Sequence, residues 1–259
     1  MKRLKPAELK DFLEEKFLLY NTTKFIETDP VSIPHLFTKK EDIEIAGFLS
    51  ATIAWGQRKT ILRNARQLMQ WMDDDPHRFI INFTEDDLEP FRKFVHRTFH
   101  ADDTIFFLKS LKNIYRNKGG LSALFIKSNA SHPDPLKNSI IHARSIFFEL
   151  PHLPRTEKHF SDPAAGSAAK RLNMFLRWMV RQDHAGVDFG IWKETSSSDL
   201  ICPLDVHSGR VARKLGLLDR NQNDWKAAAE LTENLKKMDA NDPVKYDFAL
   251  FGLGVFEKF

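Results

Sequence analysis

The sequence is poor in cysteine, because Cys202 is the only one among its 259 residues. A single cysteine excludes an internal disulfide framework, a multi-cysteine zinc site and a four-cysteine iron–sulfur cluster within one chain. We therefore expect a protein of the reducing cytoplasm. In the favoured interpretation we also expect no metal and no other cofactor.

Long apolar runs are also lacking. Acidic residues and lysines interrupt the opening segment MKRLKPAELKDFLEEKFLLY where a signal peptide needs an apolar core. No later window approaches the roughly eighteen uninterrupted apolar residues of a membrane-spanning helix. We therefore expect no export signal and no membrane anchor, and we expect a monomer.

Glycine is scarce, with 11 residues, and runs that alternate apolar and polar residues are short. With 42% apolar and 29% charged residues, the chain is globular and can bury one large core or two modest ones. Apolar residues recur at helical spacing in most windows, which predicts an all-α protein. The expected helices cover residues 7–20, 41–55, 56–72, 87–99, 103–117, 120–128, 135–149, 166–182, 205–218 and 224–238 and the C-terminal NDPVKYDFALFGLGVF. The best strand candidate, FIINF at 79–83, is short.

Residues 200–218 read LICPLDVHSGRVARKLGLL, and this stretch leaves the role of Asp205 open. A carboxylate before a helix accepts hydrogen bonds from the unpaired amides of the first turn and is favoured by the helix dipole. The same carboxylate, held close to a reacting sugar, can stabilise a developing positive charge. Both roles, capping and chemistry, are compatible with the residues.

The segment GSAAKRLNMFLRWMVRQ predicts the strongest amphipathic helix of the chain. Five residues recur at the spacing of a core stripe: Leu172, Phe175, Leu176, Met179 and Val180. Lys170, Arg177 and Arg181 are expected on the opposite face. Such a basic face is typical of a solvated surface, and its functional interpretation is contact with phosphates. The formal charge of +4 and the pI near 9.0 are compatible with a polyanionic partner.

Three segments carry a family resemblance: IAGFLSATIAWGQRKTILRNARQLM, PAAGSAAKRLNMFLRWMVR and PLDVHSGRVARKLGLL. Their order resembles that of the helix-hairpin-helix DNA glycosylases, the superfamily of endonuclease III and 8-oxoguanine glycosylase. The third segment resembles the Val-Asp-Thr-His motif, with Asp205 at the catalytic aspartate and His207 at the following histidine. The second is similar to the hairpin and its following helix, with Lys170 where bifunctional members carry a nucleophilic lysine. The first resembles the helix whose end enters the space of the flipped nucleotide, here with Gln57 or Trp55.

The sequence departs from the glycosylase pattern at the hairpin. Gly166 alone stands for the Gly-x-Gly pair, and Lys170 follows it by four positions instead of two. Lys170 and Asp205 are 35 positions apart, which is more than in endonuclease III, and the iron–sulfur cysteines of that enzyme are absent. The same segments also resemble a bacterial family of uncharacterised function, of proteins of this size, within or beside the superfamily.

The resemblance implies a two-lobed helix-hairpin-helix fold with a cleft between residues 41–182 and a second lobe of residues 1–40 plus 183–259. It implies a DNA repair glycosylase, with or without abasic-site lyase activity, that acts at the nucleoid on double-stranded DNA containing a lesion. Asp205 would stabilise the positive charge on the sugar. Lys170 would either attack the sugar as a neutral amine or contact a phosphate as one more cation at a helix start. The implied DNA-binding residues are Gly166, Ser167, Arg171, Arg177, Arg181, His207, Arg210, Gln57 and Trp55.

Two other functions stay open on the sequence. In VHRTFHADD, His96 and His100 stand at i and i+4 and are followed by Asp102 and Asp103. On a helix this spacing suits a divalent metal and a metal-dependent hydrolase, although the catalytic Glu of H-E-x-x-H is absent. The other alternative is a DNA-binding relative of the glycosylases without catalysis, which the reduced hairpin favours and the retained PLDVH opposes.

Overall fold

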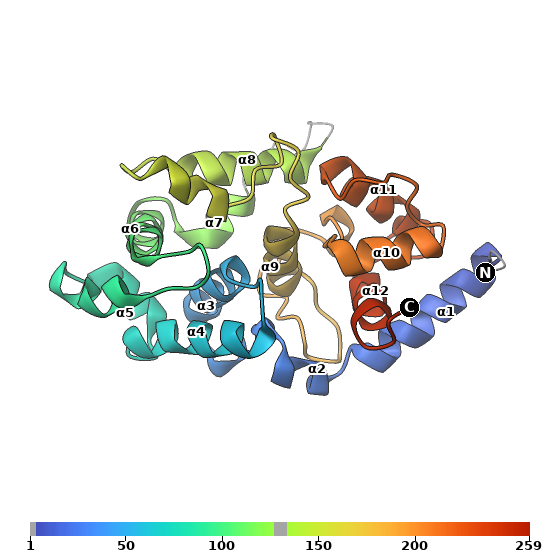
Figure 1. Ribbon diagram of the computed structural model, residues 1–259, viewed down its shortest axis with the longest axis horizontal. Coiled ribbons are helices and arrows are strands. Elements are labelled where there is room, and N and C mark those ends of the chain that lie inside the picture. The colour runs from blue at the N-terminus through green and yellow to red at the C-terminus, as the bar shows by residue number, and fades with distance from the viewer. Residues whose placement is uncertain (1–3, 127–133) are drawn as a thin grey trace. The chain divides into compact units, whose positions relative to one another are not determined.

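The computed structural model describes residues 4–126 and 134–259 of the chain. Within these ranges the regular elements are helices and no strand occurs, which confirms the prediction of an all-α protein (Figure 1). FIINF, the strand candidate, lies mostly in the helix α5 (Pro76–Asn82). No helix in this part of the chain is long and apolar enough to cross a bilayer.

Backbone contacts divide the chain into two units. One unit comprises Met1–Phe25 together with Pro163–Phe259, and the other comprises Ile26–Asp162. These units divide at 25/26 and 162/163, whereas the sequence predicts lobe boundaries at 40/41 and 182/183. The short helix α2 (Thr23–Thr28) spans the first of the observed boundaries. The basic helix belongs with the C-terminal residues, because its arginines pair with carboxylates of that region.

The unit of residues 26–162 is organised around α3 (Lys40–Thr52), a helix that is buried from Asp42 to its end. Its run IEIAGFLSAT is apolar on nearly all sides, which is the pattern of a helix enclosed by others. The elements that contact α3 are α4 (Arg58–Trp71), α5, α7 (Gly120–Ile126) and the 3-10 helices η1 (Pro30–Ser32) and η2 (Pro34–Leu36). The unit also contains α6 (Ala101–Asn117), α8 (Pro135–Phe147) and η4 (Pro154–His159).

The predicted helix at 87–99 is absent. A 3-10 helix, η3 (Asp86–Lys93), takes up its first half and contains Pro90, which has no backbone N–H to donate. The chain then turns, with backbone hydrogen bonds between His96 and Phe99 and a left-handed Arg97 at φ +56°. Because α6 begins only at Ala101, the preceding residues have no helical face.

The second unit consists of helices from both ends of the chain. They are α1 (Pro6–Tyr20), α9 (Lys170–Val180), α10 (Val206–Lys214), α11 (Trp225–Lys236), α12 (Tyr246–Val255) and the 3-10 helices η5 (Ser197–Asp199) and η6 (Pro243–Lys245). The N-terminal α1 runs beside the C-terminal α12, which also packs on α10 (Figure 1). The apolar stripe predicted for α9, from Leu172 to Val180, is buried, which confirms that prediction.

Two glycines allow the close packing of α12. A Cβ atom at Gly252 would lie 2.1 Å from the ring of Tyr20 on α1, closer than two carbon atoms can approach. A Cβ atom at Gly254 would lie 3.1 Å from the Cβ of His207 on α10. The FGLG stretch of the C-terminal segment thus brings α12 against the helix that Asp205 begins.

Candidate functional site

Lys170 and Asp205, the two residues predicted to be catalytic, lie together in the same unit. Lys170 Nζ is 3.8 Å from Asp205 Oδ2, although 35 positions separate the two residues in the sequence. Their side chains retain 28% and 27% of their exposure. The pair is therefore long for an ion pair and partly open to solvent.

Asp205 is held rigidly as the N-cap of α10. Its Oδ1 accepts hydrogen bonds from the backbone N–H groups of His207 and Ser208, at 2.8 Å and 3.0 Å. Its own N–H donates to the Ser208 hydroxyl at 2.9 Å, and the Asn223 side-chain amide donates to its carbonyl at 3.0 Å. One carboxylate oxygen thus caps the helix while the other faces Lys170, so the two roles that the sequence left open are compatible.

Lys170 is the first residue of α9 and follows a turn that needs left-handed backbone. Gly166 has φ +89° and Ala169, the N-cap, has φ +48°. The Gly166 N–H donates to Pro163, and its carbonyl accepts from the N–H of Trp225, each at 3.1 Å. A backbone bridge between Ser167 and Asp224 ties the same turn to the start of α11. These bonds fix the point at which α9 begins and hence where Lys170 stands.

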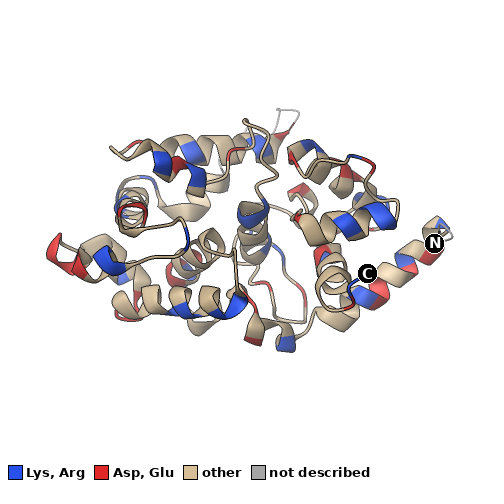
Figure 2. Ribbon diagram, in the orientation of Figure 1, with Lys and Arg blue, Asp and Glu red and all other residues tan. Residues whose placement is uncertain are grey.

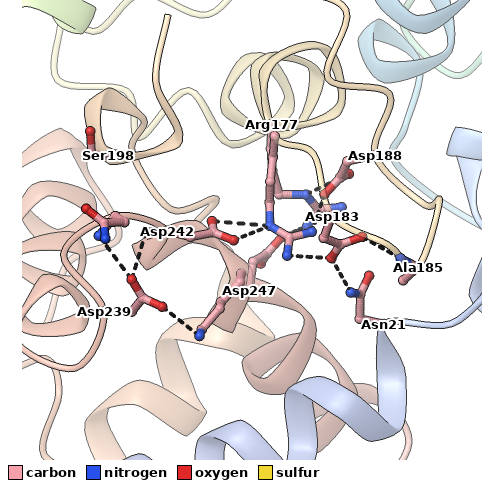
Figure 3. Close-up of polar contacts among 12 residues, drawn as sticks. Asn21, Arg177, Asp183, Ala185, Asp188, Ser198, Asp239, Asp242 and Asp247 are labelled. Atoms are coloured by element: carbon pink, nitrogen blue, oxygen red, sulfur yellow. Dashed lines mark hydrogen bonds and ion pairs between the residues drawn. The ribbon is translucent and has the colours of Figure 1, made fainter.

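Arg177 and Arg181 do not form the predicted basic face. Both are buried, Arg177 on α9 with 3% exposure and Arg181, the residue directly after α9, with 1%. The carboxylates of the pocket that receives them are Asp183, Asp188, Asp242 and Asp247 (Figure 3). The prediction that these two arginines contact phosphates is therefore corrected, because their guanidinium groups already lie in internal ion pairs.

Arg181 shows how tightly these pairs are made. Its guanidinium contacts Asp183 at 2.7 Å, Asp242 at 2.9 Å and Asp188 at 3.0 Å. Burial alone would lower the pKa of Arg181, but the three nearby negative charges outweigh burial and raise it. Arg177 bridges Asp188, at 3.3 Å, and Asp247 in the same way.

Asp247, on α12, is a buried carboxylate that lies outside the motifs predicted from the sequence. Burial raises its pKa to about 6, against the lowering effects of the charges on Arg177 and Lys170. The charges on Asp205 and Asp188 also act on it, in the raising direction. Asp247 is therefore electrostatically linked to the Lys170–Asp205 pair. The sequence feature that could have indicated this residue is a single acid within the otherwise apolar run YDFALFGLG.

The remaining predicted DNA-binding residues of this unit lie close to Lys170 or to Asp205 in the sequence. Gly166 and Ser167 are exposed in the turn before α9, and His207 and Arg210 are exposed on α10. One guanidinium nitrogen of Arg210 donates to the Gly254 carbonyl at 3.1 Å, which ties α10 to the end of α12. Arg171 is half-buried, and burial lowers its pKa to about 10.

Trp55 and Gln57 lie in the other unit, between α3 and α4. Trp55 is half-buried, its ring stacks on His159 at 5.9 Å, and its carbonyl is 3.0 Å from the Nε2 atom of His96. Gln57 is exposed and is the N-cap residue of α4. Gln57 is thus the more accessible of the two residues predicted to enter the space of a flipped nucleotide.

The structure contradicts the metal-site geometry proposed for His96 and His100. These residues precede α6 and lie in a turn, so they do not share a helical face. His96 is buried, and its ring nitrogens are each 3.0 Å from a partner, the Asn64 amide and the Trp55 carbonyl. Among the described residues, no group of three or more His, Cys, Asp or Glu side chains could hold a metal ion.

Comparison with known proteins yields one family. Residues 29–256 match the model of a family described as "Protein of unknown function (DUF2400)". No curated protein and no solved structure matches the chain.

Proposed function

Since the chain belongs to the DUF2400 family, whose description assigns no activity, we propose from the site itself that it is a DNA glycosylase with an abasic-site lyase step. The substrate of this proposal is double-stranded DNA that contains a damaged or modified base. The proposal extends to the helix-hairpin-helix glycosylase fold, with residues 163–169 as a reduced hairpin. The observation that carries it is the part-exposed Lys170–Asp205 pair, with Nζ 3.8 Å from Oδ2.

Each member of the pair has a defined role in this chemistry. Lys170, as a neutral amine, attacks C1′ of the nucleotide while the bond from C1′ to the base breaks, and the base leaves with a proton. Asp205 stabilises the positive charge that builds on the sugar, and its Oδ2 can accept the proton that the attacking nitrogen loses and pass it to the departing base. Because Oδ1 is bound by two backbone amides, the carboxylate needs no reorganisation during the reaction.

The lyase step follows from the covalent intermediate. Opening of the sugar ring leaves an imine between Lys170 Nζ and C1′, and removal of a C2′ proton then expels the 3′-phosphate group. Water hydrolyses the imine and returns Lys170 as the free amine. Met174, one turn further along α9, lies against the amine, with its sulfur 3.9 Å from Nζ, and gives it a partly apolar surrounding.

A borohydride-trapping experiment tests the proposal. Duplexes that contain 8-oxoguanine, uracil, an alkylated base or an abasic site are incubated with the wild type, Lys170→Gln, Asp205→Asn and the control Lys226→Gln. We expect a trapped covalent complex with the wild type and the control, none with Lys170→Gln, and a strong reduction with Asp205→Asn. Duplex binding without base release or trapping on any substrate would instead indicate a non-catalytic DNA-binding protein.

A further inference from the structure

The unit of residues 26–162 carries a basic hollow of about 530 Å³ on the exposed side of α4. Its lining includes Arg63, Asn64, Arg66, Gln67, Gln70 and Lys93, and none of its lining residues is a carboxylate. Arg63, Gln67 and Gln70 recur at the i, i+4, i+7 spacing of one helical face, and all three are exposed. One face of α4 is thus presented to solvent as a row of hydrogen-bond donors.

The floor of this basic hollow is a buried asparagine. Asn64 has 4% exposure, and its amide nitrogen lies 3.2 Å from the Val95 carbonyl and 3.0 Å from the His96 ring. Its side-chain oxygen accepts a hydrogen bond from Arg63 Nε at 3.2 Å. The segment that carries Lys93 is therefore fixed to α4, and the Arg63 side chain is directed by a partner that is itself immobile.

The charge of the hollow is poorly compensated. From Ile45 to Met72 the sequence contains four basic residues and no acidic one, and Lys and Arg recur along α4 (Figure 2). Arg66 pairs with Asp74 at 3.2 Å, but both side chains of that pair remain at least 40% exposed. Neither Arg63 nor Lys93 forms an ion pair with any residue that the structure describes. The hollow therefore presents positive charge without an internal counter-ion at two of its three cations.

We propose that the basic hollow binds backbone phosphates of double-stranded DNA, as a second contact apart from the Lys170–Asp205 pair. Arginine matches phosphate geometry with two donors, and glutamine amides add donors without repelling the cations. Each phosphate that Arg63 or Lys93 neutralises releases condensed counter-ions, so binding here is independent of sequence and sensitive to salt. A lipid surface fits less well, because Val95 is the single apolar residue of the lining. The identity of the ligand as DNA rests on the proposed function.

The test compares two double variants of equal charge in fluorescence anisotropy with an undamaged duplex. Arg63→Gln with Lys93→Gln removes two cations of the hollow, and Arg78→Gln with Lys118→Gln removes one exposed and one half-buried cation elsewhere in the same unit. We expect the first to weaken binding by about 10-fold or more at moderate salt and to lower the salt slope by about 2. The matched variant should change affinity by less than about 3-fold. Equal losses in both variants would overturn the inference.

A chemical footprint supplies an independent readout that does not require substitution. Acetylation of the wild type in the presence of duplex should spare Lys93 and leave Lys118 modified, as read by mass spectrometry. Equal modification of Lys93 with and without duplex, or equal protection by polyglutamate, would overturn the inference. Catalysis is measured separately by borohydride trapping. If the hollow variants bind duplex more weakly but the protein releases no base, the phosphate-binding hollow is supported and the glycosylase proposal is overturned. If the wild type is trapped but the hollow variants bind duplex as the wild type does, the glycosylase proposal is supported and the hollow is overturned. If the protein binds no duplex at low salt, both proposals are overturned.

Discussion

The two ends of α9 use the same type of interaction in opposite ways. At its start, Lys170 faces Asp205 at 3.8 Å, and both side chains are more than a quarter exposed. Toward its end, Arg177 and Arg181 are buried, and the contacts of Arg181 lie between 2.7 and 3.0 Å. The ion pairs at the arginine end are short and buried, whereas the ion pair at the lysine end is long and partly exposed to solvent.

Under the proposed function, this difference separates a structural ion pair from one that is available for chemistry. A guanidinium surrounded by carboxylates in the interior cannot leave them without exposing uncompensated buried charge, so it holds the helix in place. An amine 3.8 Å from a part-exposed carboxylate can exchange that partner for a substrate at little cost. The buried arginine pairs thus provide the rigid support on which Lys170 is positioned.

Lys170→Arg tests the open end with its charge retained. We expect trapping and strand cleavage to fall by about 10³-fold or more, because a guanidinium stays protonated and cannot form an imine. The free energy of unfolding should change by less than about 1 kcal/mol, since the pair is partly solvated. Lys226→Arg, on the exposed face of α11, serves as the control. Trapping at the wild-type rate in Lys170→Arg would place the nucleophile elsewhere.

Arg181→Met tests the closed end. Its removal leaves Asp188, Asp242 and Asp183 without this partner, and we expect a loss of about 3–5 kcal/mol in the free energy of unfolding. Urea denaturation followed by circular dichroism measures this loss. Arg220→Met removes an arginine that pairs with Asp224 on the surface and should leave the free energy of unfolding close to that of the wild type. Similar losses in both variants would contradict the distinction between the two kinds of pair.

Asp247→Asn tests the carboxylate that interacts with both Lys170 and Arg177, through the pH dependence of the free energy of unfolding. The folded-state pKa of Asp247, about 6, lies above its ordinary value of 3.8, so the folded state binds this proton more tightly than the unfolded state. Its contribution to stability is therefore most favourable at acid pH and declines as pH rises from about 4 to 6. We expect the stability difference, wild type minus Asp247→Asn, to fall by roughly 1–3 kcal/mol between about pH 4 and pH 7.

Denaturation at several pH values, with Asp219→Asn as an exposed control, measures this difference. The charged groups that act on Asp247 are Arg177, Lys170, Asp205 and Asp188, and all of them are retained in the variant. A stability difference that rises with pH would show that the Arg177 charge, and not burial, dominates at this carboxylate.

Gly209→Ala should have the smallest effect and tests the cap that positions Asp205. An added Cβ would lie 2.8 Å from the Asn223 side-chain oxygen, so Asn223 must move, and it donates to the Asp205 carbonyl. We expect a loss of about 1 kcal/mol in stability and a several-fold lower trapping rate. Asn223→Ala should reproduce the loss of rate, and the double variant should be no worse than the single ones. An unchanged rate in both would show that Ser208 and His207 hold Asp205 unaided.

The helices were largely predictable because their signals are local. The spacing of Leu172, Phe175 and Met179 specifies a buried face regardless of what covers it, and Asp205 caps α10 through amides two and three residues away. The prediction failed at residues 87–99, where apolar residues also recur but Pro90 favours a 3-10 helix. It failed again at FIINF, because a run of five residues is too short for its apolar pattern to distinguish a strand from a short helix.

The basic side chains of α9 could not be sorted from the sequence. Lys170, Arg177 and Arg181 are all positively charged. Helical spacing does not indicate which of them will be surrounded by carboxylates from other segments. Only the fold places Asp188, Asp242 and Asp247 around the arginines, and the unit boundaries shift from their predicted positions for the same reason. The approach of Lys170 to Asp205 across 35 positions also depends on the fold, although both residues were chosen from their motifs.

The sequence by itself determined the all-α character of this protein, the buried face of α9 and the cap that Asp205 makes, because each depends on residues within a few positions of one another. The tertiary structure decided which cations are buried, which carboxylate faces Lys170, and how far apart the two atoms stand. Those properties depend on charges brought together from distant segments, and the free energy of burying a charge is set by what surrounds it.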